Sequence, residues 1–319
     1  MTKIDLITGI LGSGKTTFLR HYAKHLLSQG KRIAILENDF GAVNVDMMML
    51  RDLQGDNCQL AMITGGGDPD CHKRRFRTQL ITLGMQGFDR VIVEPSGIYD
   101  MDEFFDTLHE SPIDRWFEAG TVLTIIDSGM KDLSEQMDYL LASEAACCGK
   151  LVVSKIKEYP PDTDSLLARI NCALENISCT RRFTEKDMFI KDWEELSPAD
   201  MDSLLNAGYR TSAYVKRFAP DMMSSSVHYF MHLDIPEDMI DKTISSILSD
   251  KECGKIFRIK GALPTSNGIL KINATPEKTE VSPVNSGQAL LIVIGDDLCC
   301  EKISSHLQKV NNDPKYVCI

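Results

Sequence analysis

The stretch GILGSGKT, residues 9–16, follows a short apolar segment. A helical pattern begins at Lys15, near the end of this stretch. The stretch fits the spacing G-x-x-x-x-G-K-[ST], in which glycines let backbone N–H groups wrap around an anion at a helix N-terminus. Lys15 would then reach the β- and γ-phosphates of a nucleotide, and the Thr16 hydroxyl would bind Mg²⁺. The residues expected to contact the nucleotide are Gly9, Gly12, Ser13, Gly14, Lys15, Thr16 and Thr17. The alternative is a strand-to-helix turn that only happens to contain glycine.

Strand and helix patterns alternate along the rest of the N-terminal half. The predicted strands cover residues 31–38, 58–64, 89–97, 120–127 and 149–155. Such alternation is typical of an α/β fold with a mostly parallel sheet covered by helices on both faces. We therefore expect the P-loop NTPase architecture.

Polar residues stand where these predicted strands end. In open α/β sheets, ligands lie beyond the carboxyl ends of the strands. The residues expected near the phosphate loop are Asn38, Asp39, Glu94, Ser96, Gly97 and Asp127. Glu94 or Asp39 would position water or the metal, and the Gly97 N–H would contact the terminal phosphate. The alternative for any one of them is a solvated strand end.

Composition limits the classes of partner. The 319 residues carry a net charge of −11, which disfavours a broad nucleic-acid surface. No run approaches the roughly 18 apolar residues that cross a bilayer, so we expect no membrane partner and a cytoplasmic protein. The ten cysteines have no disulfide spacing, and most are expected to be free thiols. The vicinal pairs 147–148 and 299–300 have no third Cys or His beside them in the sequence.

The chain resembles the CobW-type P-loop GTPases of the SIMIBI class, the CobW/HypB/UreG proteins. The resemblance rests on TGILGSGKTT in the phosphate loop, ENDFGAVNVD at 37–46, VEPSG at 93–97, RINCALEN at 169–176 and IFRIKG at 256–261. It implies slow, Mg²⁺-dependent hydrolysis of GTP by a switch or metallochaperone in metal or cofactor maturation of the cobalamin type. It also implies a client metalloprotein or cofactor-pathway enzyme and a nucleotide-dependent homodimer.

The base-recognition segment departs from the family pattern. The family uses N-K-x-D, whereas this chain has Ser154, Lys155, Ile156 and Lys157, with Glu158 one position late. The Lys155 stem can lie along the base, but the carboxylate that pairs with guanine is missing unless Glu158 replaces it. GTP is expected from the resemblance, and ATP remains an alternative, because a lost polar partner weakens discrimination.

The metal-binding loop departs as well. The family carries N-G-C-x-C-C, where this chain has ITGGGDPDCHKR at 63–74, and Ala42 replaces an upstream Glu. The residues that can still bind Zn²⁺ or another transition metal are Glu37, Cys71, His72 and either Asp68 or Asp70. Adjacent Cys and His side chains point in different directions, however. The alternative is a nucleotide-responsive loop with a lost or remodelled metal site, leading into a helix near Pro69.

Proline and serines between Phe218 and Val227 predict a domain boundary. We expect a nucleotide-binding domain over 1–218 and a CobW C-terminal-like α+β domain over 228–319.

Two other functions remain open. One is a nucleotide-gated scaffold that does not hydrolyse its nucleotide and has lost the metal site and strict guanine specificity; the other is a small-molecule kinase, which would need an acceptor lid that the sequence does not reveal.

Overall fold

The computed structural model describes residues 1–38, 49–63, 69–95, 101–130, 133–217, 227–276, 278–284 and 289–318, with the backbone alone for Pro69, Asp70 and Asp296. The chain divides into two compact units, Met1–Asp221 and Met222–Ile319. The boundary predicted at 218–227 falls almost wholly outside the described residues.

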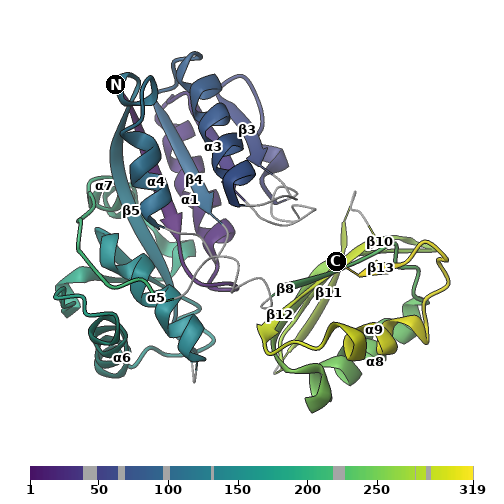
Figure 1. Cartoon of the computed structure of the whole chain (residues 1–319). Helices are drawn as coiled ribbons and strands as arrows, with labels where there is room; N and C mark the ends of the chain where they lie inside the picture. Colours follow the sequence, from purple (N-terminus) through teal and green to yellow (C-terminus); the bar gives the residue numbers. More distant parts are fainter. Residues whose placement is uncertain are drawn as a thin grey trace. The chain divides into compact units, whose positions relative to one another are not determined.

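The first unit is built on a seven-stranded parallel sheet, in the order β3-β2-β4-β1-β5-β6-β7. The strands are β1 (Thr2–Thr8), β2 (Ile33–Asn38), β3 (Cys58–Ile63), β4 (Arg90–Pro95), β5 (Phe117–Asp127), β6 (Lys150–Ser154) and β7 (Met188–Ile190). Helices lie on both faces of this sheet (Figure 1). The predicted fold class is confirmed, and β7 is an additional strand at the edge.

Three of the helices described in this unit begin at capping side chains. The helices of the unit are α1 (Lys15–Ser28), α3 (Pro69–Gly84), α4 (Met101–Leu108), α5 (Glu135–Cys147), α6 (Thr163–Asn176) and α7 (Pro198–Leu205), with short 3-10 turns η1 (Arg51–Leu53), η2 (Ile113–Arg115), η3 (Glu185–Asp187) and η4 (Trp193–Glu195). Ser134, Asp162 and Ser197 accept hydrogen bonds from backbone N–H groups at the starts of α5, α6 and α7. Such caps satisfy donors that a helix start leaves open.

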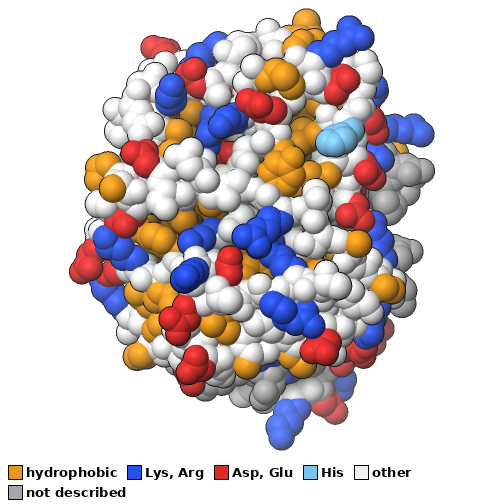
Figure 2. Space-filling model, turned by 90° about the vertical axis from the view of Figure 1, so that its left-hand side faces the viewer, with side chains coloured by type: hydrophobic (Ala, Val, Ile, Leu, Met, Phe, Trp, Pro, Cys, Tyr) orange, Lys and Arg blue, Asp and Glu red, His pale blue; other side chains and the backbone are white. Residues whose placement is uncertain are grey.

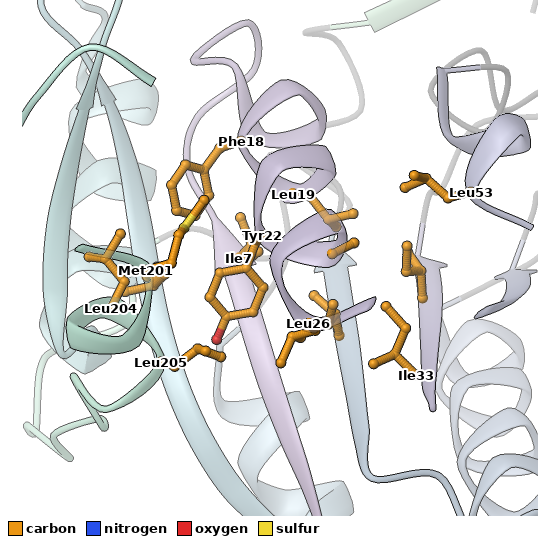
Figure 3. Close-up of a cluster of buried hydrophobic side chains, with 14 of the residues drawn as sticks. Ile7, Phe18, Leu19, Tyr22, Leu26, Ile33, Leu53, Met201, Leu204 and Leu205 are labelled. Atoms are coloured by element: carbon orange, nitrogen blue, oxygen red, sulfur yellow. The ribbon is translucent and has the colours of Figure 1, made fainter. Parts of the chain in front are cut away.

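The buried face of α1 fixes the helix that follows the phosphate loop. Its apolar residues recur at helical spacing and pack on the sheet and on α7 (Figure 3). The contributors labelled there are Ile7, Phe18, Leu19, Tyr22, Leu26, Ile33, Leu53, Met201, Leu204 and Leu205. Burying each Leu, Ile or Phe side chain contributes about 1.5–3 kcal/mol. The start of α1 is therefore held in place by its own core contacts.

A buried polar cluster also fastens α1 to the sheet. Asp5 accepts hydrogen bonds from the Tyr22 hydroxyl at 2.9 Å, from Arg90 at 2.8 Å and from the Thr121 backbone N–H at 2.8 Å. Burial nevertheless raises the pKa of Asp5 above its usual value. These bonds join β1, α1, β4 and β5 below the phosphate loop.

The second unit is a six-stranded sheet in the order β11-β10-β9-β12-β8-β13, with antiparallel pairing throughout. Its elements are β8 (Val227–Met231), α8 (Glu237–Ser249), η6 (Lys251–Cys253), β9 (Lys255–Thr265), β10 (Gly268–Ala274), β11 (Thr279–Val284), β12 (Leu290–Asp296), α9 (Cys300–Gln308) and β13 (Val317–Cys318). Apolar side chains of α8 and α9 pack with those of the sheet in one core. The α+β organisation predicted for this region is thus observed, with β13 in addition.

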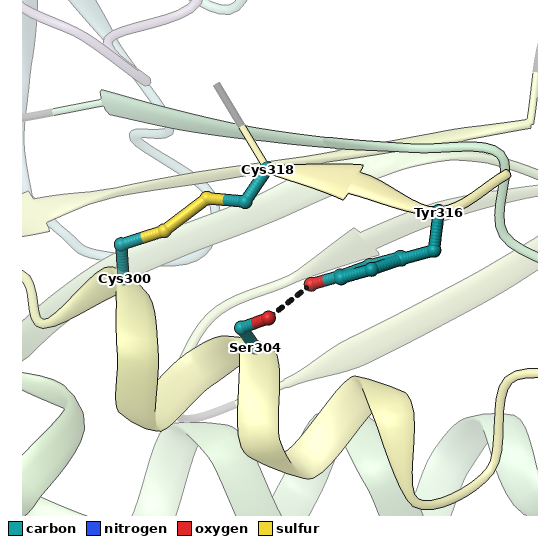
Figure 4. Close-up of a disulfide and its surroundings, with 4 residues drawn as sticks. All are labelled: Cys300, Ser304, Tyr316 and Cys318. Atoms are coloured by element: carbon teal, nitrogen blue, oxygen red, sulfur yellow. Dashed lines mark hydrogen bonds between the residues drawn. A yellow bond between two sulfur atoms is a disulfide. The ribbon is translucent and has the colours of Figure 1, made fainter.

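One disulfide links Cys300 to Cys318 and joins the start of α9 to β13. Beside it, the Tyr316 hydroxyl donates to Ser304 Oγ at 2.8 Å (Figure 4). No second pair of cysteines is linked in the part of the chain that the structure describes. The spacing of the cysteines did not predict this pair, because β13 was not predicted.

Of the described helices, none has the length and apolar character needed to cross a membrane.

Candidate functional site

The phosphate loop takes the conformation that its glycines allow. Gly9, Gly12 and Gly14 have positive φ values of 144°, 82° and 102°, a region that side chains with a Cβ rarely occupy. A Cβ on Gly9 would also lie 2.5 Å from the Ile125 carbonyl oxygen. The Ser13 N–H donates to the Ile10 carbonyl oxygen at 3.1 Å and closes the turn. The loop therefore depends on glycine for both its backbone and its fit against β5.

The N-terminus of α1 is left open to an anion. Its N-cap is Gly14, no side chain caps it, and its first turn holds no acidic residue. This contrasts with α5, α6 and α7, each of which begins at a side-chain cap. Uncapped N–H groups and the helix dipole both favour a phosphate at this position.

Lys15 lies across the loop that it follows. Its side chain is buried, and Nζ donates to the carbonyl oxygen of Gly9 at 2.8 Å and of Ile10 at 3.5 Å. The ammonium is therefore held among the loop residues that would surround the phosphates. A charged donor in that place forms strong hydrogen bonds to phosphate oxygens.

Thr16 is joined to the end of a neighbouring strand. Its hydroxyl donates to Glu94 Oε1 at 2.8 Å, and the two residues are only 8% and 4% exposed. Both side chains offer oxygen atoms, the ligand type that Mg²⁺ prefers. The pair is therefore suited to hold a magnesium ion, to which the Thr16 hydroxyl would be a ligand.

Comparison with known proteins agrees with this geometry. The family model described as "CobW/HypB/UreG, nucleotide-binding domain" matches residues 3–184. The chain belongs to the CobW/HypB/UreG family. The resemblance inferred from its motifs is confirmed.

Three curated relatives have zinc in their names. The chain is 30% identical to the zinc chaperone YeiR of Escherichia coli K12 over 171 residues, 53% of this chain and 51% of YeiR. It is 28% identical to the E. coli zinc chaperone YjiA over 179 residues, 53% of this chain and 54% of YjiA. The zinc chaperone CobW of Pseudomonas aeruginosa is 27% identical over 137 residues, 39% of this chain and 35% of that protein. The matches therefore span about half of these relatives or less.

A solved structure of zinc-bound YjiA GTPase from E. coli aligns with 98% of this chain and 99% of its own. The identity is 14% and the TM-score is 0.37. At this level of similarity, the alignment gives no information on the side chains of the site.

In this family member, the predicted base segment is bonded within the protein. Lys155 has a positive φ of 55°, and its ammonium forms an ion pair with Asp127 at the end of β5. The Ser154 hydroxyl donates to the Ile126 carbonyl oxygen at 3.2 Å. Glu158 is exposed, and its backbone N–H donates to the Lys155 carbonyl oxygen at 3.0 Å. Lys155 and Asp127 thus lie together at the end of the sheet, and the role of Glu158 stays a prediction.

Sequence reasoning missed an aromatic neighbour of this segment. A Cβ on Gly14 would lie 3.2 Å from Trp193 Cη2 and 3.8 Å from Ser154 Cβ. Trp193 also packs edge-on against Phe18, with ring centroids 5.3 Å apart. The indole therefore supports the start of α1 beside the base segment. Nothing local in the sequence links Trp193 to the phosphate loop, because 179 residues separate it from Gly14 and only the fold joins them.

The predicted transition-metal site is not assembled by the described residues. Two groups of three potential ligands occur among them, and neither contains Glu37, Cys71 or His72. His72 is buried on α3, with Nδ1 4.0 Å from Glu103 Oε1, and burial lowers its pKa to about 4. Cys71 is half-buried and Glu37 is buried at the end of β2. Asp39, Gly97, residues 64–68 and the Asp70 side chain lie outside the described residues, so their roles stay predictions.

A buried acid behind the phosphate loop was also missed. Glu144 of α5 has no exposed surface. Burial raises the pKa of its carboxyl to about 7, and the Lys15 ammonium, the Thr8 hydroxyl and the Gly9 N–H lower it by smaller amounts. The signal was present in the sequence, because Glu144 is the one charged residue in the run LLASEAACC. An acid in an otherwise apolar helix segment indicates a buried partner.

Replacement of Glu144 with Gln is expected to stabilise the fold mainly at high pH. The folded pKa of about 7 lies above the ordinary 4.5, so stability falls as the pH rises between these values. Glu144→Gln should therefore raise the free energy of unfolding by about 2–3 kcal/mol more at pH 8 than at pH 5. Urea unfolding at both pH values measures this difference. Glu135→Gln, at the exposed start of the same helix, is the control, and an equal effect at both pH values contradicts the raised pKa.

Acidic and basic side chains are mixed on one face of the molecule. On the face drawn in Figure 2, Lys and Arg side chains are interspersed with Asp and Glu. That face therefore presents no continuous basic patch of the kind that binds nucleic acid.

Proposed function

We propose that this chain is a slow, Mg²⁺-dependent GTPase that acts as a switch in metal delivery or cofactor maturation, including maturation of the cobalamin type. The observation that carries the proposal is the open, uncapped start of α1 with Lys15 inside the loop and Thr16 bonded to Glu94. Phosphoryl transfer depends on positioning the reacting groups and on stabilising negative charge, and these residues can supply both. Family membership and three relatives named as zinc chaperones support the biological setting.

The residues take separate roles in this proposal. The loop N–H groups and the start of α1 hold the phosphates, and Lys15 moves from the Gly9 carbonyl to stabilise charge on the transferred group. Thr16 would hold magnesium, which would neutralise phosphate charge when bound. The Glu94 carboxylate would orient the attacking water. Asp39 is proposed to assist Glu94, and the Gly97 N–H to contact the terminal phosphate.

Base selection is proposed to involve Ser154, Lys155 and Glu158. The Lys155 ammonium is held by Asp127, so the stem of Lys155 can lie along a base in a fixed direction. The preference for GTP over ATP is expected to be small unless Glu158 turns toward the base, because a missing recognition carboxylate leaves little to discriminate.

The test is phosphate release from GTP and from ATP, each with and without Mg²⁺ and Zn²⁺. The proposal expects release that requires Mg²⁺ and is faster with GTP, and a stimulation by Zn²⁺ supports the link to metal delivery. Tight binding of nucleotide without release in any condition overturns the hydrolase and supports a nucleotide-gated scaffold. Nucleotide-dependent dimerisation and binding of a client metalloprotein are further proposals of the same account.

A further inference from the structure

Two segments of the second unit lie in contact and bring together side chains of the types that bind metals in proteins. The first is the end of α8 with η6, which carries Asp250 and Cys253, and the second is α9, which carries His306. The Cys299 N–H donates to the Cys253 carbonyl oxygen at 3.1 Å, and Lys302 pairs with Glu252 at 2.6 Å. These two bonds fasten the start of α9 against η6.

One ligand atom from each of Asp250, Cys253 and His306 lies within 4.8 Å of the other two. His306 Nε2 is 2.8 Å from Asp250 Oδ2, and its Nδ1 is 3.3 Å from the Ser246 hydroxyl. A hydrogen bond to the second ring nitrogen is typical of metal-bound histidine, because it fixes the orientation of the ring. The side chains therefore come from one short turn and one helix, with the ring already oriented.

The three side chains offer one sulfur, one nitrogen and one oxygen atom. Zinc binds such atoms at about 2.3, 2.0–2.1 and 2.0–2.2 Å, which places ligands roughly 3.3–3.6 Å apart in a tetrahedron. The three atoms lie within 4.8 Å of one another, so the longest spacing would close by at most roughly 1.5 Å. The 2.8 Å between His306 Nε2 and Asp250 Oδ2 would open by about 0.5 Å, and rotation of these two partly exposed side chains can supply both changes. Asp250 and His306 are partly exposed, so the fourth position faces water.

We propose that Asp250, Cys253 and His306 bind one zinc ion in the second unit, with the fourth position left open for exchange. The proposal goes beyond the nucleotide site, since it rests on residues of the second unit alone and holds whether or not the chain hydrolyses GTP. An open position suits a site that accepts and releases its ion, since structural zinc sites are closed by four protein ligands.

Charge balance supports the same site. The Asp250 carboxylate and a Cys253 thiolate neutralise a divalent ion. A cysteine that binds zinc does so as a thiolate and gives up its proton to the solvent.

The alternative is a core thiol beside an ordinary ion pair. Cys253 packs in the apolar core with Ile303 and Leu307, and His306 with Asp250 is a salt bridge seen in many proteins. A buried thiol that only packs would tolerate Ala, and the exposed pair alone would contribute little stability. Metal binding distinguishes the two readings directly.

Titration of the full chain with Co²⁺, followed by its thiolate charge-transfer absorbance, tests the proposal, with Zn²⁺ as competitor. Cys253→Ala, Asp250→Asn and His306→Gln should each lose one equivalent of metal or weaken its binding by at least about tenfold, because each removes one of three ligands. Zn²⁺ should raise the thermal unfolding midpoint of the unchanged chain but not of these variants.

Cys172→Ser is the matched control. Cys172 is an exposed free cysteine on α6 of the first unit. This control should retain the equivalent that the three variants lose. All variants should bind GTP as the unchanged chain does, which separates a failure of this site from a failure of the nucleotide site. The proposal is overturned if the three variants bind as many equivalents, as tightly, as the unchanged chain.

Discussion

Lys15→Met is expected to weaken binding of GTP by roughly 100- to 1,000-fold, the cost of removing a buried charged partner of phosphate. Met keeps the length and apolar contacts of the Lys stem, so the change removes the charge and its donors. The ammonium is buried and already directed into the loop by the Gly9 carbonyl. Calorimetric titration with GTP and Mg²⁺ measures the loss.

Lys24→Met is the matched control for Lys15→Met. Lys24 lies on the same helix and is exposed, so its replacement should leave affinity for GTP within about twofold, as for most surface substitutions. Equal affinities for the Lys15 variant and the unchanged chain would mean that Lys15 does not touch the phosphates.

Glu94→Gln is expected to lower kcat for GTP hydrolysis by roughly 100- to 1,000-fold, the range for loss of a group that manages a proton or water in the transition state. The amide oxygen of Gln can still accept the hydrogen bond from Thr16. It lacks the charge that, in the proposed mechanism, orients water and supports magnesium. The affinity for GTP should therefore change by only a few-fold, because Lys15 and the loop remain.

Single-turnover phosphate release separates the two effects of Glu94→Gln. Glu118→Gln, at an exposed position of β5, is the control and should hydrolyse GTP at the unchanged rate. A Glu94 variant with normal kcat would assign the water-positioning role to another residue, with Asp39 the first to examine.

The phosphate loop and its sheet could be predicted because their signals are local or follow from the architecture. Residues 9–16 are consecutive, and their spacing alone fixes which backbone groups meet a phosphate. The contact between Thr16 and Glu94 spans 78 residues. The motif nevertheless predicted the place of Thr16, and the rule that strand ends meet at one edge predicted that Glu94 lies near the loop. Each strand that the apolar pattern predicted in the first unit is present in the structure.

Other features could not be predicted, because they depend on how distant helices pack. Cys253 and His306 come together only through the packing of η6 and α9, and Cys300 meets Cys318 only through β13. In the sequence, the vicinal cysteines 299 and 300 have no third Cys or His beside them. The structure places His228 and Cys318 beside Cys300, and the Cys253 backbone beside Cys299.

The zinc ligands expected at Cys71 and His72 stay a prediction. They are adjacent in the sequence, but on α3 their side chains leave in different directions, and His72 faces Glu103 of α4. A short sequence separation predicts a shared ligand set only when the periodicity of the element allows it.

The most direct test of the central account is calorimetric titration of the purified chain with GTP, in the presence and in the absence of Mg²⁺. The account predicts one nucleotide bound per chain, tighter with Mg²⁺ than without, since Thr16 and the triphosphate share the ion. No binding, or binding that neither Mg²⁺ nor Lys15→Met changes, would contradict a phosphate-loop nucleotide site in this protein.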